Sequence, residues 1–332
     1  MRFIDLERLR EISDWPPGRQ PYPNMKIERW RERQEAMLTS LQNATTARER
    51  ADIIDRNGDL WSEVKIHMRR RSHDKCWYCE TKIIDNPGDI DHYRPKKKVE
   101  ESPDHQGYWW LAFEWRNWRF VCRFCNSDNR DQETGHVSGK ANHFPLVDDN
   151  ESRRAKGPKD CDYEDLRRYE RPALLDPTVR DDIGLITFTN EGVPVPVATN
   201  EHLVKYKRAK KSIEVYHLDR SALNNHRKKV YIKAERYVRA YLKYRDRWER
   251  DQSDEAEEKM SEAGYELAHM IAHDAEYSAT VIAYLEKYFL LHPQETWIMT
   301  LLTTPSEPVY ASGYMPAASV NPGATEEKDT RS

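Results

Sequence analysis

Four of the five cysteines form two C-x-x-C pairs, and this spacing constrains the chain more than any other feature. Cys76 and Cys79 form one knuckle, and Cys122 and Cys125 form the other. Each knuckle can offer two thiolates to one tetrahedral Zn²⁺. Two unrelated thiol pairs, one of them redox-active, are the alternative. Because residues 80–121 exceed the gap of a simple zinc ribbon, the spacing predicts a shared structural zinc with a segment inserted between the knuckles.

The composition is that of a polar but folded chain. Of the 332 residues, 38% are hydrophobic and 33% are charged, and 10 Trp, 18 Tyr and 7 Phe can still build a core. The composition therefore favours a folded chain over full disorder. No apolar run reaches the roughly 18 residues of a membrane-spanning helix, and charges replace the apolar stretch of a signal peptide near the start. We expect a cytoplasmic protein that has no membrane contact and no disulfides.

The charges are nearly balanced in number but unevenly spread. The sequence has 54 basic and 57 acidic residues, so a global basic signature for nucleic acid is absent. Basic runs nevertheless occur at 67–71, at 94–98 and through 205–250. A local basic face can bind phosphate even when the total charge is near neutral. Each run can equally be a solvated helix face, and the sequence leaves both interpretations open.

Patterns along the chain predict an α+β fold in which the zinc-stapled unit is embedded in a mainly helical protein. Good helix formers fill both flanks, with a break near Asn57-Gly58 and a helix expected to begin at Asp254. That helix is expected to run with breaks to Leu291, before Pro293. The predicted regions are an N-terminal helical region (1–72), the cysteine-containing unit (73–150), a loop with short strands (151–200), a C-terminal helical region (201–302) and a disordered tail (303–332).

The segment between the knuckles carries residues suited to phosphodiester hydrolysis. Asp91 and His92 are adjacent, Asn117 precedes the second knuckle, and Asn126 follows it directly. A neutral histidine can accept a proton from water, and hard oxygen ligands suit Mg²⁺ or Mn²⁺. Neighbouring side chains of a strand point to opposite faces, so Asp91 and His92 share a site only if the strand ends or bulges there. The order of these residues resembles the HNH endonuclease motif in its zinc-stapled form.

In HNH endonucleases a ββα-metal unit holds the active site, and the resemblance implies a role for each matching residue. His92 would be the general base. Asp91 and Asn126 would hold the catalytic Mg²⁺ or Mn²⁺, and Asn117 would brace the loop that orients His92. The structural zinc, held by the four knuckle cysteines, would clamp the two ends of the unit.

Three basic residues near the motif would contact phosphates by the same resemblance. They are Arg94, Lys96 and Arg130. The usual ending of the motif is C-N-x-x-K, whereas Asn129 takes the position of that lysine here. Either the basic role has moved to Arg130 or Asn129 approaches the metal, and the sequence leaves this end of the site open.

The residues around the motif resemble a narrower family. Five stretches carry the likeness, namely DHYRPK (91–96), GYWWLAFEWRNWRFVCRFCN (107–126), GKANHFPL (139–146), PALLDPT (172–178) and SIEVYHLDRSALNNHR (212–227), the last of which resembles a Leu-x-Arg-x-x-Leu stretch of the family. They are similar to the HNH proteins of bacterial anti-phage systems, which are the Septu nucleases of the PtuB family and the related retron-associated proteins. The likeness covers residues 70–240 and leaves out the N-terminal helices and the tail.

This resemblance implies a metal-dependent endonuclease that acts in phage defence, with DNA as the favoured substrate and an ABC/SMC-like ATPase of the PtuA type as partner. The sequence has no Walker A pattern, so any ATP dependence must come from another chain. RNA such as tRNA is the alternative substrate, because the motif does not select the sugar. A zinc module that binds nucleic acid or a partner without cutting is the alternative function.

Other features have a structural and a functional interpretation. Four tryptophans near the motif fit the core of the unit, with stacking on unpaired bases as the alternative; they are Trp109, Trp110, Trp115 and Trp118. The apolar stretch 280–302 is either core or a docking surface. Asp181 and Asp182 are expected to be exposed, and Cys161 is expected to be an incidental thiol.

Overall fold

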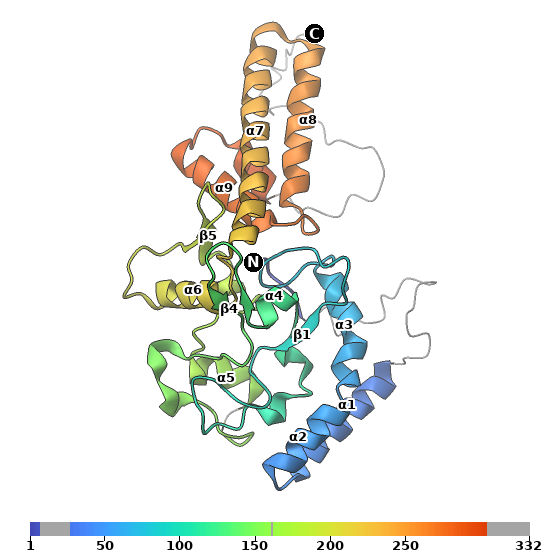
Figure 1. Ribbon diagram of the computed structural model, residues 1–332. Helices are drawn as coiled ribbons and strands as arrows, with labels where there is room; N and C mark the ends of the chain where they lie inside the picture. The colour runs from blue at the N-terminus through green and yellow to red at the C-terminus, as the bar shows by residue number, and fades with distance from the viewer. Residues whose placement is uncertain (7–26, 161, 304–332) are drawn as a thin grey trace, which may run out of the picture.

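Helices dominate the chain, and three small sheets lie among them (Figure 1). The computed structural model describes residues 1–6, 27–160 and 162–303. Within these ranges each sheet has two antiparallel strands. A long pair of helices, α7 (Ser221–Asp251) and α8 (Asp254–Ile271), projects as an arm from the body that holds the sheets. The mixture of helices and small sheets agrees with the predicted α+β class.

Three helices precede the central sheet, and the last of them packs against both of its strands. They are α1 (Ile27–Asn43), α2 (Ala47–Arg56) and α3 (Asp59–Arg71). Thr46 caps α2 in a capping box with Glu49, and Asn57-Gly58 separates α2 from α3 as predicted. The Trp30 indole donates to Leu60 O at 3.0 Å, which ties α1 to the start of α3. Helices therefore fill residues 27–71, with one further break before α2.

The segment between the knuckles forms the central sheet. Strand β1 (Asp89–His92) pairs with β2 (Trp118–Val121), and His92 lies opposite Trp118. Every residue of β2 is buried. A single helical turn, α4 (Arg123–Asn126), follows β2 directly. The order is therefore strand, strand, helix, and it places both knuckles at one end of the sheet.

Aromatic side chains pack the connection between β1 and β2. Trp110 and Trp118 are buried, and Trp109 and Trp115 are half-buried against the same core. Trp118 also meets Trp30 edge to face, with ring centroids 6.1 Å apart. The four tryptophans of this region therefore belong to the core, as their structural interpretation expects.

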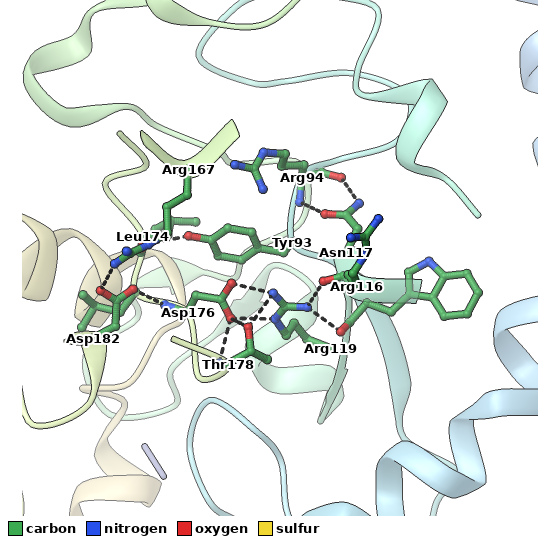
Figure 2. Close-up of polar contacts among 12 residues, drawn as sticks. Tyr93, Arg94, Arg116, Asn117, Arg119, Arg167, Leu174, Asp176, Thr178 and Asp182 are labelled. Carbon is green, nitrogen blue, oxygen red and sulfur yellow. Dashed lines mark hydrogen bonds and ion pairs between the residues drawn. The ribbon is translucent and has the colours of Figure 1, made fainter. Parts of the chain in front are cut away.

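A loop with buried ion pairs packs behind β2 (Figure 2). Arg119 of β2 donates to both carboxylate oxygens of Asp176, at 2.8 and 2.5 Å. Asp182 is buried as well and forms ion pairs with two arginines. The prediction that Asp182 is exposed is therefore wrong, whereas Asp181 is exposed. The two arginines lie outside the turn that holds Asp182, and they make its burial possible.

Short elements fill the rest of the body. They are β3 (Asn129–Arg130), β4 (Val137–Ser138), α5 (Tyr163–Glu170), β5 (Ile186–Phe188), β6 (Pro194–Pro196) and α6 (Val204–Val215). Strand β3 pairs with β4, and β5 pairs with β6. The β5–β6 pair lies in the region where the sequence predicts short strands.

The C-terminal helices form a second hydrophobic core. Helices α9 (Ser278–Leu291) and α10 (Trp297–Thr303) pack against the base of the arm. Helix α8 begins at Asp254 and α9 ends before Pro293, both as predicted. Val281 and Ile298 are fully buried, and most apolar residues of the stretch 280–302 lie in or against this core, whereas Leu290, Leu291 and Met299 are exposed.

Within the described ranges, no helix is both long enough and apolar enough to cross a membrane. Two sequence predictions concern residues outside those ranges. They are the disordered tail from residue 304 onward and the incidental thiol of Cys161.

Candidate metal centre and active site

The four knuckle cysteines meet in one buried cluster. Their Sγ atoms all lie within 4.8 Å of one another, and the Sγ atoms of Cys79 and Cys122 are 3.7 Å apart. A tetrahedral Zn²⁺ with Zn–S bonds of about 2.3 Å needs sulfur–sulfur edges of about 3.8 Å. The cluster therefore fits a structural metal such as zinc, as the spacing predicts.

Backbone hydrogen bonds position the two knuckles. Cys76 N donates to Thr81 O at 2.9 Å and closes a tight turn around the first knuckle. The next residue, Trp77, donates its backbone N–H to Phe120 O at 3.0 Å, which fixes that turn beside β2. The second knuckle follows β2 without a connection, and Cys122 is the N-cap of α4. The cluster therefore joins the segment before β1 to the end of β2.

Arg220 lies beside the cysteine cluster, a contact that no sequence pattern predicts. Its Nη1 is 3.7 Å from Cys125 Sγ and its Nη2 is 3.5 Å from Cys79 Sγ, so both nitrogens can donate to thiolates. Four thiolates on one Zn²⁺ carry a double negative charge, and the buried guanidinium offsets part of it. In the sequence Arg220 is the arginine of HLDRSAL (217–223), and it lies 95 residues after Cys125, so no local pattern links the two.

Replacing Arg220 by methionine is expected to weaken zinc binding by about 10–100-fold, because the variant loses both donors and the charge facing the thiolates. Competition with a chromogenic chelator measures this affinity. Arg220→Lys should recover part of it, since lysine keeps the charge but not the planar pair of donors. Arg130→Met, on the exposed strand β3, is the control. Equal zinc affinities for the wild type and Arg220→Met would contradict the role given to Arg220.

His92 ends β1 with its imidazole buried. Its Nε2 lies 2.8 Å from Ala112 O and its Nδ1 lies 3.3 Å from Lys96 Nζ. A carbonyl oxygen can only accept, so Nε2 carries the proton and Nδ1 keeps its lone pair. Burial, and next the charge of Lys96, hold the pKa of His92 well below its usual range. The imidazole is therefore neutral at pH 7, with Nδ1 as its basic atom.

The N-terminal helices contribute a wall around this histidine. The Trp61 ring of α3 meets the His92 ring edge to face, with centroids 5.1 Å apart. Lys96 Nζ lies 5.1 Å from the centroid of the same indole, and burial lowers the pKa of Lys96 to about 8. Helix α3 therefore completes the surroundings of His92, although it lies outside the stretch that carries the family resemblance.

Asn117 holds the backbone that follows His92 (Figure 2). Its Oδ1 accepts from Arg94 N at 2.9 Å, and its Nδ2 donates to Arg94 O at 3.0 Å. Its own backbone O accepts from Tyr93 N at 2.8 Å. The side chain is fully buried. These bonds tie the end of β1 to the start of β2, which is the geometry that a brace of the His92 loop requires.

The three predicted phosphate contacts have different surroundings. Lys96 lies beside His92. Arg130 is exposed on β3 and donates to Gly135 O at 3.0 Å. Arg94 is buried and donates to the carboxylate of Glu170 at 2.8 Å, so its guanidinium does not reach solvent. Breaking such a buried pair costs about 3–5 kcal/mol. This placement disagrees with the expectation that Arg94 contacts a phosphate.

Asp91 shares one face of β1 with Asp89, two residues earlier, and is buried. Tyr78 Oη donates to Asp91 Oδ2 at 2.6 Å, and Lys140 Nζ donates to Asp91 Oδ1 at 2.9 Å. Asn126 Nδ2 donates to Asp89 Oδ2 at 3.2 Å. The structure thus brings Asp89 and Asn126 together beside Asp91. Asp89 is not among the metal ligands predicted from the sequence. The available signal is its position two residues before Asp91, because such residues of a strand lie on the same face.

Lys140 lies where a continuous helix would place the lysine of C-N-x-x-K. In an α-helix, the N–H of residue i+4 donates to the carbonyl of residue i. Lys140 N donates to Cys125 O at 3.0 Å, and Ala141 N donates to Asn126 O at 2.7 Å. The N–H groups of Lys140 and Ala141 therefore make the hydrogen bonds that the next residues of α4 would make, and the hairpin of β3 and β4 lies between Asn126 and Lys140.

The insertion explains the departure from the motif at Asn129. The Asn129 side chain donates to backbone carbonyls, including Ser127 O at 2.7 Å, and so serves the hairpin. Gly139 closes the insertion, because a Cβ there would lie 2.1 Å from Ser127 O. The chain thus keeps a lysine at this end of the site, and Lys140 is the residue that supplies it.

The donors on this face suit a hard divalent cation. Each oxygen of Asp91 accepts one hydrogen bond, and a carboxylate offers about four lone-pair sites, so lone pairs remain. Asp89 and Asn126 are half-buried. Among the described residues, the cysteine cluster alone brings three or more Cys, His, Asp or Glu ligands close together. One or two carboxylates completed by substrate phosphates are, however, the usual protein share of a Mg²⁺ site.

The chain is similar to the Septu protein PtuB of Bacillus mycoides (strain KBAB4), with 33% identity over 172 residues. The match covers 50% of this chain and 50% of that protein, so the chain spans about half the length of the curated relative it matches. No protein-family model matches the chain. No solved structure matches it.

Proposed function

We propose that this chain, whose likeness to the Septu protein PtuB supports membership of the PtuB-like family, is a metal-dependent HNH endonuclease of anti-phage defence. The observation that carries the proposal is the surroundings of His92, a neutral buried imidazole with its basic Nδ1 beside a lysine. The cysteine cluster supports it, because a metal there would clamp both ends of the unit formed by β1, β2 and α4. The residues thus follow the order of the HNH motif.

His92 would be the general base of phosphodiester hydrolysis. As the oxygen of a water molecule attacks phosphorus in line, Nδ1 takes the proton that this water loses. The bond from Nε2 to Ala112 O stabilises the positive charge that then forms on the ring. Asn117 keeps the following backbone in place, so the ring holds its direction. Lys96 would exchange its contact with Nδ1 for a phosphate oxygen and thereby place the phosphate next to the base.

Asp91 and Asn126, with Asp89 beside them, would hold the catalytic ion. Such an ion supplies Lewis-acid stabilisation of the charge that develops on the phosphate and on the leaving oxygen. Lys140 Nζ donates to Asp91 Oδ1 and to His92 O, both at 2.9 Å. It therefore links the proposed ligand to the backbone of the proposed base. We assign Lys140 as a positioning residue, and Arg94 has no phosphate role in this proposal.

The substrate and the partner are proposed from the family resemblance. DNA is the favoured substrate and RNA such as tRNA is the alternative, because the HNH motif would bind a phosphodiester without selecting the sugar. An ABC/SMC-like ATPase would restrain or direct the nuclease. Both assignments extend to the whole protein a likeness that covers half of the chain.

A cleavage assay with the full chain tests the nuclease. Plasmid DNA and total tRNA are offered side by side with Mg²⁺, with Mn²⁺ and without added metal. We expect cleavage of DNA that requires the added ion and leaves 5′-phosphate and 3′-hydroxyl ends, because water attacks phosphorus and the 3′ oxygen leaves. Cleavage of tRNA alone would favour the ribonuclease. An absence of cleavage both for the isolated chain and for its complex with the ATPase would contradict the proposal.

A further inference from the structure

One side of the arm carries cations that the proposed active site does not use. Helix α7 contains ten Lys and Arg against four Asp and Glu. Its buried residues include Ala234 and Val238, which pack in the second hydrophobic core. At 3.6 residues per turn, Lys229, Arg236 and Lys243 recur every second turn on the opposite side. All three are exposed, so they form one line along the solvent side of the helix.

Two further exposed cations flank this line. Lys233 lies 3.5 Å from the carboxylate of Glu266, and Arg239 lies 2.7 Å from that of Glu235. For the three residues of the line themselves, no ion pair with a carboxylate exists among the residues that the structure describes. We call the five residues Lys229, Lys233, Arg236, Arg239 and Lys243 the cationic face of α7. With a rise of about 1.5 Å per residue, this face is about 21 Å long.

The tip of the arm has the opposite charge. The exposed acids of α7 all lie in its last six residues, and α8 contains six Asp and Glu against one Lys. Because α8 runs antiparallel to α7, its acidic first turns lie at the same tip (Figure 1). A long polyanion would therefore be repelled by the tip and attracted to the part of α7 that precedes these acids.

The start of α7 is fixed to the unit that carries His92. Ser221 N and Oγ donate to the two oxygens of Asp131, at 2.5 and 3.1 Å. Asp131 lies just after β3, and the neighbouring Arg220 contacts the cysteine cluster. The cationic face therefore keeps a set orientation relative to the β1–β2 unit, and a ligand held on it is held relative to that unit.

We propose that the cationic face of α7 binds the phosphate backbone of the nucleic acid substrate, away from the bond that is cut. The inference rests on the proposed function, because it names a second contact for the same substrate. Protein–protein interfaces centre on apolar and aromatic residues, whereas nucleic-acid interfaces are polar and positively charged. Among the described residues of α7, Ile232 is the sole large hydrophobic side chain that is well exposed. The face therefore fits phosphates better than an acidic protein.

A binding assay with the full zinc-loaded chain tests this inference. Mg²⁺ and Mn²⁺ are left out, so that binding is measured without cleavage. Fluorescence anisotropy follows a short labelled DNA duplex and a short labelled RNA over a series of salt concentrations. The variant Arg236→Gln with Lys243→Gln is expected to bind roughly tenfold more weakly and to lower the slope of log K against log salt by about 2. Glutamine is a good helix former and both positions are exposed, so the arm stays folded.

The matched control is Lys259→Gln with Lys287→Gln, which removes the same charge from exposed positions on α8 and α9. It should stay within about twofold of the wild type, since it spares the phosphate contacts. A loss with both probes supports a backbone contact shared by DNA and RNA, and a loss with one identifies the nucleic acid. Equal binding by the two double variants, or a wild type that binds neither probe, overturns the inference. Because cleavage is measured in a separate assay, a negative binding result would not by itself contradict the proposed nuclease activity.

Discussion

His92→Ala is expected to lower the cleavage rate by about 10²–10⁴-fold, because the variant has no group that accepts the proton of the attacking water. The assay uses the substrate and the divalent ion that the wild type requires. Zinc content and thermal stability are measured in the same preparations, since the imidazole is buried and its removal can disturb packing. The expected result is loss of cleavage with the zinc retained.

Two further variants separate the chemistry of His92 from its packing. His92→Gln keeps an N–H that can reach the position of Nε2 and donate to Ala112 O, but an amide is not a base near neutral pH. It should therefore be as inactive as His92→Ala while being better packed. His136→Ala, which changes an exposed histidine on the β3–β4 hairpin, should cleave at the wild-type rate. Cleavage by zinc-loaded His92→Gln at the wild-type rate would remove His92 from the proposed mechanism.

Features governed by short-range rules could be predicted from the sequence. The break at Asn57-Gly58 and the start of α8 at Asp254 follow from turn residues and helix capping, which act within a few residues. The cysteine cluster could also be predicted, although its halves are far apart in the chain. Each C-x-x-C knuckle is local, and one metal with four ligands explains why two such knuckles meet.

Lys140 could not be placed from the sequence, because the spacing of the motif assumes a continuous helix after Asn126. In the structure that helix ends at Asn126, the hairpin of β3 and β4 follows, and Lys140 N then donates to Cys125 O as the next helical residue would. Lys140 therefore lies where the lysine of the motif is expected in space, although it comes later in the sequence than the motif places it. The close approach of Gly139 to Ser127 shows that the two ends of the insertion fit tightly together.

Buried charges were the main source of wrong predictions, because a charged residue looks like a surface residue unless its partner is known. Arg94 pairs with Glu170, which is 76 residues away. Asp182 is buried because arginines of α5 and α6 surround it. The contact of Arg220 with the cysteines has the same origin. In each case two distant segments pack together, and local patterns contain no information about that packing.

Replacing Cys122 by serine is expected to abolish zinc binding and to lower the melting temperature by on the order of 10 °C. Structural zinc contributes its binding free energy to folding, and about 3 °C of melting temperature corresponds to 1 kcal/mol in a domain of this size. Metal analysis and thermal melts measure both effects. Cys161→Ser, at the fifth cysteine, is the matched control and should match the wild type. A Cys122→Ser protein that retains one zinc per chain would contradict the shared site.

The same variant should also loosen the base of the arm, because residues beside the first knuckle hold the C-terminal helices. Glu80 follows Cys79 and accepts from Ser278 Oγ and Ala279 N, both at 3.1 Å, at the start of α9. Arg220 makes the corresponding contact at the start of α7. Without the metal the first knuckle has no fixed geometry, and neither anchor keeps its partner. Hydrogen exchange should therefore increase at the starts of α7 and α9 as well as in the knuckles; an increase confined to the knuckles would show that the arm is held independently of the zinc.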